Sequence, residues 1–161
     1  MAGPMAPPTR MQLGRIKRQL ATARRGHKLL KDKRDELMRR FLALVSKARR
    51  QRETVQKALS AYYQSMAAAR AEMGQAAYFA ALCWPGPPLT VETGTQKAMG
   101  AVLCTLRGQA PPQPALCLET AGLKEGMAQL CALWPELLAL AEMEENIRRL
   151  GREIERTRRR V

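Results

Sequence analysis

The chain has 161 residues, which suits one domain and is short for two. Lysine and arginine number 28 against 14 acidic residues, giving a formal net charge of +14, and aromatic residues make up only 4%. Five valines and three isoleucines are too few to anchor a β-sandwich or a β-barrel, whereas good helix formers are abundant. The composition therefore predicts an all-α protein.

Residues 1–8 contain three prolines and no apolar stretch typical of a signal peptide, so we expect a disordered leader and a cytoplasmic protein. The longest apolar run, Ala76 to Trp84, is far shorter than the ~20 residues needed to cross a bilayer. No direct membrane insertion is expected.

Residues 9–83 are predicted to form one long helix. Thr9 can act as its N-cap, and no proline occurs between Arg10 and Leu82. About 70 residues at 1.5 Å per residue would span about 105 Å. The prolines that follow Trp84 end the pattern.

Residues 84–121 form a short central segment rich in glycine and proline, which we expect to be irregular or a small β-hairpin. A second helix is predicted over residues 122–161. Pro135 is either a kink in it or the first residue of its main part.

Apolar residues recur at alternating steps of three and four in both helices, which predicts a narrow coiled-coil seam. The predicted seam comprises Leu13, Ile16, Leu20, Leu30, Leu37, Phe41, Leu44, Val55, Leu59, Met66, Leu137, Leu140, Met143, Ile147, Leu150 and Ile154. The stripe favours a long antiparallel coiled-coil hairpin. The alternative is a globular bundle of separate amphipathic helices, which a helix of this length does not suit.

A hairpin that folds about residue 101 would place Val161 opposite Phe41. Residues 10–40 would then carry an apolar stripe without a partner in the chain, and we expect them to fray in the isolated protein.

Both helices are strongly basic where they run beyond the middle segment. Sixteen basic residues lie between Arg10 and Arg52, against three acidic ones. The candidate contact surface comprises Arg10, Arg15, Arg18, Arg24, Arg25, Lys28, Lys31, Arg158, Arg159 and Arg160. Charge on all outer positions leaves three readings open: a structural shaft in an assembly, a basic nucleic-acid-binding or scaffold coiled coil, or a membrane-surface helix. The narrow seam argues against the last.

No motif indicates catalysis or a bound cofactor. The chain lacks the P-loop, dinucleotide-binding and zinc-protease patterns, and it has one histidine. Four widely spaced cysteines do not form a zinc motif, so we expect free thiols and no metal.

Two blocks of sequence resemble a known family. Pro8 to Met11 with Arg25 to Phe41, and then Leu138 to Val161, are similar to the two signature regions of the D subunit of V-type (vacuolar and archaeal-type) ATPases and ATP synthases. Lys97 to Val102 resembles the family's central segment.

The resemblance implies a non-catalytic rotor shaft in the central stalk. In this family a long coiled coil enters the hexamer of A and B subunits, and it is clasped by the F subunit. The funnel-shaped C (or d) subunit connects it to the proteolipid ring, so that ATP hydrolysis or synthesis is coupled to proton or sodium transport. The implied protein is cytoplasmic and peripheral to the membrane, and relatives carry a small β-hairpin in the middle of the chain.

The family's sequences continue beyond the block that ends at Val161. This difference implies an incomplete sequence, an upper shaft made of a single helix supported by the hexamer, or another chain that fills the seam.

Overall fold

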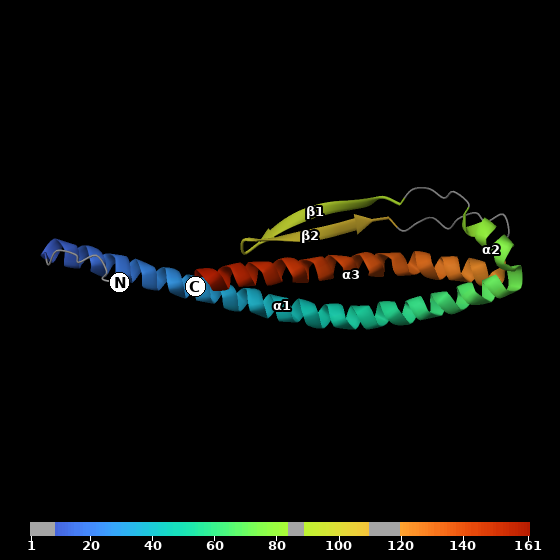
Figure 1. Cartoon of the computed structure of the whole chain (residues 1–161), viewed down its shortest axis with the longest axis horizontal. Coiled ribbons are helices and arrows are strands. Elements are labelled where there is room, and N and C mark those ends of the chain that lie inside the picture. The colour runs from blue at the N-terminus through green and yellow to red at the C-terminus, as the bar shows by residue number, and fades with distance from the viewer. Residues whose placement is uncertain (1–8, 84–88, 110–119) are drawn as a thin grey trace, which may run out of the picture.

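The computed structural model describes residues 9–83, 89–109 and 120–161. The order of elements is α1 (Arg10–Met73), α2 (Gln75–Leu82), β1 (Val91–Ala98), β2 (Ala101–Gly108) and α3 (Ala121–Arg160). Helices α1 and α3 lie side by side and antiparallel, and the two strands lie along α3 on the side away from α1 (Figure 1). The predicted helical hairpin is therefore confirmed, and of the two forms left open for its middle segment the structure shows the small β-hairpin.

Helix α1 begins as predicted, because the Thr9 hydroxyl accepts a hydrogen bond from the Gln12 amide at 3.3 Å. The prediction of one unbroken helix to residue 83 was wrong. Gly74, with φ of 76° and ψ of 161°, ends α1 in a backbone conformation that essentially only glycine adopts. The chain turns there into α2. The guanidinium of Arg70, in the last turn of α1, lies 6.0 Å from the centre of the Phe79 ring of α2.

Helix α3 begins at a second capping residue, Thr120, whose hydroxyl accepts from the Leu123 amide. Pro135 lies inside this helix and is exposed, so the predicted helix continues through it. Glycines allow α3 to approach α1 closely: a Cβ atom at Gly126 would lie 2.7 Å from the sulfur of Met66. Gly122 sits against the backbone of Ala69 in the same way.

The predicted alignment of the two long helices was also wrong. Lys33 pairs with Glu153, and Phe41 lies beside Gly151. Continuing this antiparallel register places Arg160 about level with residues 26–32 of α1, about ten residues beyond Phe41. The prediction failed because it treated residue 101 as the end of the hairpin. The helices instead separate near Ala69, and the strands fold back along α3.

Strands β1 and β2 pair antiparallel, from Val91 opposite Gly108 to Ala98 opposite Ala101. The two residues of the turn, Met99 and Gly100, have positive φ values of 52° and 82°. Positive φ at both positions is the pattern of the tight turns that match strand twist. It explains how a segment with few β-branched residues still forms a hairpin.

The core is divided into two clusters along the shaft. One joins Leu37 of α1, Ala101 of β2, and Leu150 and Ile154 of α3. The other, at the far end, contains Met66, Ala69, Ala81 and Leu123. Each cluster therefore joins three elements. Among the described residues, no helix is long and apolar enough to cross a membrane.

Candidate functional site: the helix seam and the hairpin clamp

The structure divides the predicted seam residues by exposure. Leu37, Val55, Met66, Leu150 and Ile154 are buried. Those that are half-buried are Leu30, Phe41, Leu44, Leu59, Leu137, Leu140, Met143 and Ile147. The three nearest the N-terminus, Leu13, Ile16 and Leu20, are exposed. Burial thus follows the length over which α3 accompanies α1.

Further buried positions follow the same steps of three and four. Ala48 and Ala69 on α1 and Thr157 on α3 continue these steps, and all three are buried. Leu123 and Leu133 are also buried on α3, and sequence reasoning missed both. They lie before Leu137, the first residue of the predicted seam on that helix.

Side chains across the seam pair basic groups of α1 with carboxylates of α3. Lys33 Nζ lies 2.8 Å from Glu153 Oε1, and both side chains are largely buried. The Arg52 guanidinium contacts Glu144 at 2.5 Å, and the Gln51 amide donates to Glu136. Helix α3 therefore offsets part of the positive charge of α1 where the two helices are paired.

A second set of contacts holds β2 against α3. Glu142, Asn146 and Arg149 project from one face of α3 and bond to the backbone of β2; we call these three residues the hairpin clamp. Asn146 is buried, accepts from the Cys104 amide at 2.6 Å and donates to the Cys104 carbonyl at 2.9 Å. These bonds occupy backbone groups that a third strand would otherwise pair.

The other two clamp residues extend this contact in both directions along the strand. Glu142 accepts from the Leu106 amide at 2.9 Å, and Arg149 donates to the Val102 carbonyl at 3.3 Å. Sequence reasoning missed the clamp, although its spacing of four and then three residues marks a polar stripe beside the seam.

Glu145 links the clamp to its own helix. The Arg149 Nε donates to the Glu145 carboxylate at 2.8 Å, and this bond, with the charges of Arg148, Arg149 and Arg152, lowers the pKa of Glu145. Glu145 in turn raises the pKa of Arg149. At neutral pH the pair is therefore charged, and Arg149 is held toward the hairpin.

The turn of the hairpin lies over the ion pair between the long helices. A Cβ atom at Gly100 would lie 3.1 Å from Lys33 Nζ and 4.0 Å from Glu153 Oε1. Ala101, next in the chain, is buried against Leu37 and Leu150. The turn of the hairpin thus contacts both long helices, α1 and α3, at one level of the shaft.

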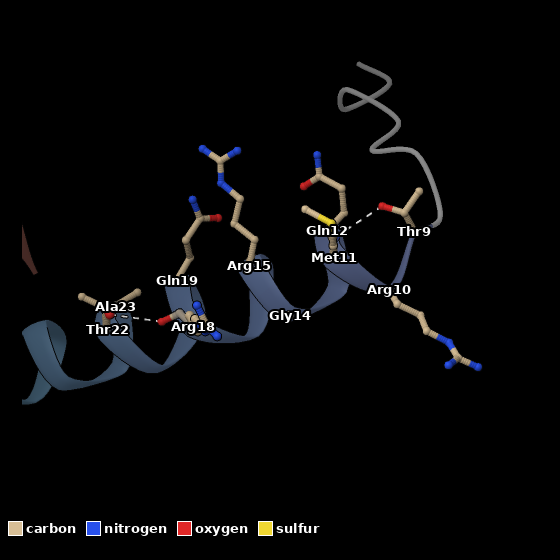
Figure 2. A pocket seen from close by; sticks show the side chains of 10 residues that line it. All are labelled: Thr9, Arg10, Met11, Gln12, Gly14, Arg15, Arg18, Gln19, Thr22 and Ala23. Atoms are coloured by element: carbon tan, nitrogen blue, oxygen red, sulfur yellow. Dashed lines mark hydrogen bonds between the residues drawn. The ribbon is translucent and has the colours of Figure 1, made fainter.

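All ten residues of the candidate basic surface are exposed. Those of α1 lie on, or just beyond, the part of the helix that extends past α3 (Figure 1). Ten residues at the N-terminal end of α1 line a broad open surface, where Arg10 and Arg15 point to opposite sides of the helix (Figure 2). Thr9 caps α1 and the other nine belong to it, so these residues form an outer face of one helix.

The described residues contain no group of three or more histidine, cysteine, aspartate or glutamate side chains placed to hold a metal. Cys83, Cys104 and Cys131 are free thiols, and Cys117 lies outside the described residues.

These features define a class of protein: a long two-helix shaft with a hairpin fixed to its flank and a basic surface at one end. The sequence profile of the family described as the D subunit of ATP synthase matches residues 12–161. The chain belongs to the D-subunit family of V-type ATP synthases.

Several relatives are similar over most of their length. The V-type ATP synthase D subunit of Acetivibrio thermocellus is 40% identical, over 96% of this chain and 72% of the relative. That of Clostridioides difficile is 39% identical with the same coverage, and that of Enterococcus faecalis is 36% identical over 96% of this chain and 76% of its own. As a member of this family, the chain is part of a multi-subunit complex.

Proposed function

We propose that this chain is the central rotor shaft of a V-type ATP synthase, a non-catalytic component that transmits rotation between the A and B subunits and the proteolipid ring. The observation that carries this proposal is the combination of a continuous two-helix rod with an outer surface that is basic on more than one side. A turning shaft presents each side in succession to the subunits around it. A surface without one preferred face suits that role.

The two ends of the rod have different surfaces, which supports different partners. The basic end of α1 is the proposed contact with the hexamer of A and B subunits. The opposite end carries α2, where Phe79 and Leu82 are exposed. We assign that end to the membrane side and to the funnel-shaped C (or d) subunit, with the F subunit along the shaft. The proposed location is cytoplasmic and peripheral to the membrane.

The proposed seam and basic surface have separate tasks. The seam residues of α1 and α3 hold the shaft together. The exposed arginines and lysines, among them Arg15, Arg18 and Arg24, contact the inner surface of the hexamer of A and B subunits. In this proposal ATP is bound by other subunits of the complex.

Co-expression with the A, B and F subunits tests the proposal. We expect the chain to co-elute with them in a stoichiometric complex by size-exclusion chromatography. A chain that co-elutes with none of them would overturn the rotor proposal. Duplex DNA binding that persists at physiological salt would instead favour the nucleic-acid-binding alternative, whereas binding only at low salt is expected of any strongly basic protein.

A further inference from the structure

Strand β1 forms the outer edge of the hairpin. Figure 1 shows β2 between β1 and α3, so β1 lies on the side away from the shaft. Residues 91–97 of this strand are all exposed. Within the part of the chain that the structure describes, the sheet has two strands, and β2 is the only one that pairs with β1. The two edges of the sheet therefore differ: the clamp occupies the edge of β2, and the edge of β1 is open.

The clamp also shows which backbone groups of β1 point outward. It bonds to the backbone of three residues of β2, which therefore point these groups away from β1: Val102, Cys104 and Leu106. Directly opposite them in β1 lie Lys97, Thr95 and Thr93. In an antiparallel pair, two opposite residues either bond to each other or both point their backbone groups outward. The amides and carbonyls of these three residues of β1 therefore point away from β2.

These outward groups of β1 have no hydrogen-bond partner among the described residues. Natural sheets protect such an edge with proline, a bulge or charged side chains. Strand β1 contains no proline and pairs with β2 in an unbroken register, and of the three outward residues only Lys97 is charged. Thr93 and Thr95 are β-branched residues suited to strand pairing. Unpaired amides and carbonyls along an exposed strand are matched by another extended backbone.

The side chains of β1 specify what this second backbone should carry. Glu92 and Lys97 are the charged residues of the strand, and they project from opposite faces because side chains alternate along it. The contact across the ladder shows the same alternation, since a Cβ atom at Gly94 would lie 2.5 Å from Oγ1 of Thr105, its partner on the same face. A strand with a carboxylate opposite Lys97 and a basic residue opposite Glu92 would be attracted at both ends.

A second copy of β1 does not meet this requirement. Two identical antiparallel strands related by a two-fold axis place residues of the same face opposite each other. Glu92 of one copy then cannot lie opposite Lys97 of the other.

We propose that β1 is a strand-addition site for an extended segment of a different chain. The segment pairs antiparallel to β1, the more stable arrangement. It carries β-branched residues opposite Thr93 and Thr95, a carboxylate opposite Lys97 and a basic residue opposite Glu92. This site is defined by the hairpin alone, whatever role the shaft has.

The test uses the 161-residue protein and fluorescent peptides of the same length as β1, which is 8 residues. The probe peptide has valine opposite Thr93 and Thr95, glutamate opposite Lys97 and lysine opposite Glu92. Its amides on the edge away from β1 are N-methylated, which limits aggregation of the peptide. In a second peptide the N-methyl groups are moved to the amides that face β1. In a third peptide the glutamate and the lysine are exchanged. Fluorescence anisotropy measures binding of each peptide.

We expect the probe to bind at least about tenfold more tightly than the second peptide, which keeps every side chain but has lost its donors to β1. The third peptide should bind about threefold more weakly than the probe, because like charges then lie opposite each other. Binding of the probe should also slow amide exchange at Thr93 and Thr95. Equal binding of the probe and either comparison peptide would overturn the proposal, and so would a probe that does not bind.

Two substitutions of one residue locate the site on the protein. Thr95→Pro removes an outward amide without removing a bond to β2, whereas Thr95→Val keeps that amide. We expect the proline variant to weaken probe binding at least about tenfold and the valine variant less than about twofold. Slow exchange of the Cys104 amide, which donates to Asn146, reports that the hairpin remains folded. Should Thr95→Pro lose this protection, the comparison of peptides, which leaves the protein unchanged, decides.

Equal affinities of a folded Thr95→Pro variant and the unsubstituted protein would contradict the strand-addition site. Sedimentation of the protein alone completes the test. A monomer supports the proposal, whereas a dimer that Thr95→Pro dissociates would show that a second copy occupies the edge of β1, and would overturn it.

Discussion

Asn146 is the polar side chain on which the position of the hairpin depends. It is 8% exposed, and it satisfies both the amide and the carbonyl of Cys104. An apolar residue in its place would leave two backbone groups of β2 buried without partners. The amide side chain thus fixes β2 on α3 at one register, which apolar contacts alone would not specify.

Replacing Asn146 with alanine should lower the free energy of unfolding by about 1–3 kcal/mol, because the Cys104 backbone groups lose their partners. Denaturant titration measures this loss, and faster exchange of the Cys104 amide locates it. Arg152→Ala is the matched control, since Arg152 is exposed on the same helix. Equal midpoints for the two variants would contradict the role of Asn146.

The Glu145–Arg149 pair makes the clamp sensitive to acid. The pKa of Glu145 is lowered from 4.5 by the hydrogen bond from Arg149 and by nearby arginines. A carboxyl with a lowered pKa in the folded state stabilises the fold above its unfolded pKa and loses that contribution as the pH falls through its folded pKa. The contribution of ionised Glu145 to stability should thus be constant at neutral pH and be lost as the pH falls below about 4.5.

An NMR titration in the acid range should then show the Val102 and Leu103 amides shifting together with the Glu145 carboxyl, because Arg149 bonds to both Glu145 and Val102. In Glu145→Gln the hairpin amides should no longer follow an acidic transition of this residue. Unchanged hairpin shifts in the native protein would show that Arg149 is held to the hairpin independently of Glu145.

At the scale of the elements, Gly74 decides where α1 ends. Nothing lies within 4 Å of a Cβ built there, so any penalty for a side chain comes from the backbone conformation and not from a clash. Gly74→Ala should therefore destabilise the protein by about 1–3 kcal/mol. Thermal melting of the two alanine variants, Gly74→Ala and Gly14→Ala, measures the difference.

Gly14 is the matched control, since it also has open space at its Cβ but lies within the helix. Gly14→Ala should increase local helix stability by up to about 1 kcal/mol. If both substitutions moved the melting temperature in the same direction, the conformational role of Gly74 would be wrong.

The seam can be tested at Leu37, which is 0% exposed and packs against α3 and β2. Leu37→Ala should cost about 2–5 kcal/mol of unfolding free energy. Leu42→Ala, at a residue 58% exposed on the same helix, should change it by less than about 0.5 kcal/mol. Chemical denaturation of both variants measures these free energies. A similar, small loss for the two would show that the seam is loosely packed at Leu37.

The sequence predicted the elements better than their relation to one another. The steps of three and four that run through Leu37, Phe41 and Leu150 specify both long helices, because helical periodicity is local. The register was missed, because it depends on where α1 turns at Gly74 and on strands that fold back along α3. The clamp was missed for a similar reason: Asn146 looks like an ordinary exposed polar residue until the strand that it binds is placed.

At the scale of the whole molecule, the unequal lengths of α1 and α3 predict unequal protection. Residues 10–27 depend on helix propensity alone, and their like charges repel one another. In the isolated protein their amides should exchange rapidly, while those from about Leu37 to Met66 remain protected. The boundary lies near residue 27, whereas the sequence alone placed it near residue 40.

Hydrogen exchange followed by mass spectrometry measures this boundary directly. Docking with the A and B subunits should slow exchange over residues 10–27 without changing residues 37–66. Slow exchange of residues 10–27 in the free monomer would contradict this prediction.

The packing of the long helices and the hairpin also determines how the rod responds to torque. Where α1 and α3 are joined by the seam, and the hairpin is fixed to their flank, bending or twisting must shear packed side chains and ion pairs such as Lys33–Glu153. A torque applied to this paired part would therefore pass along it with little twist, so that it behaves as a stiff axle.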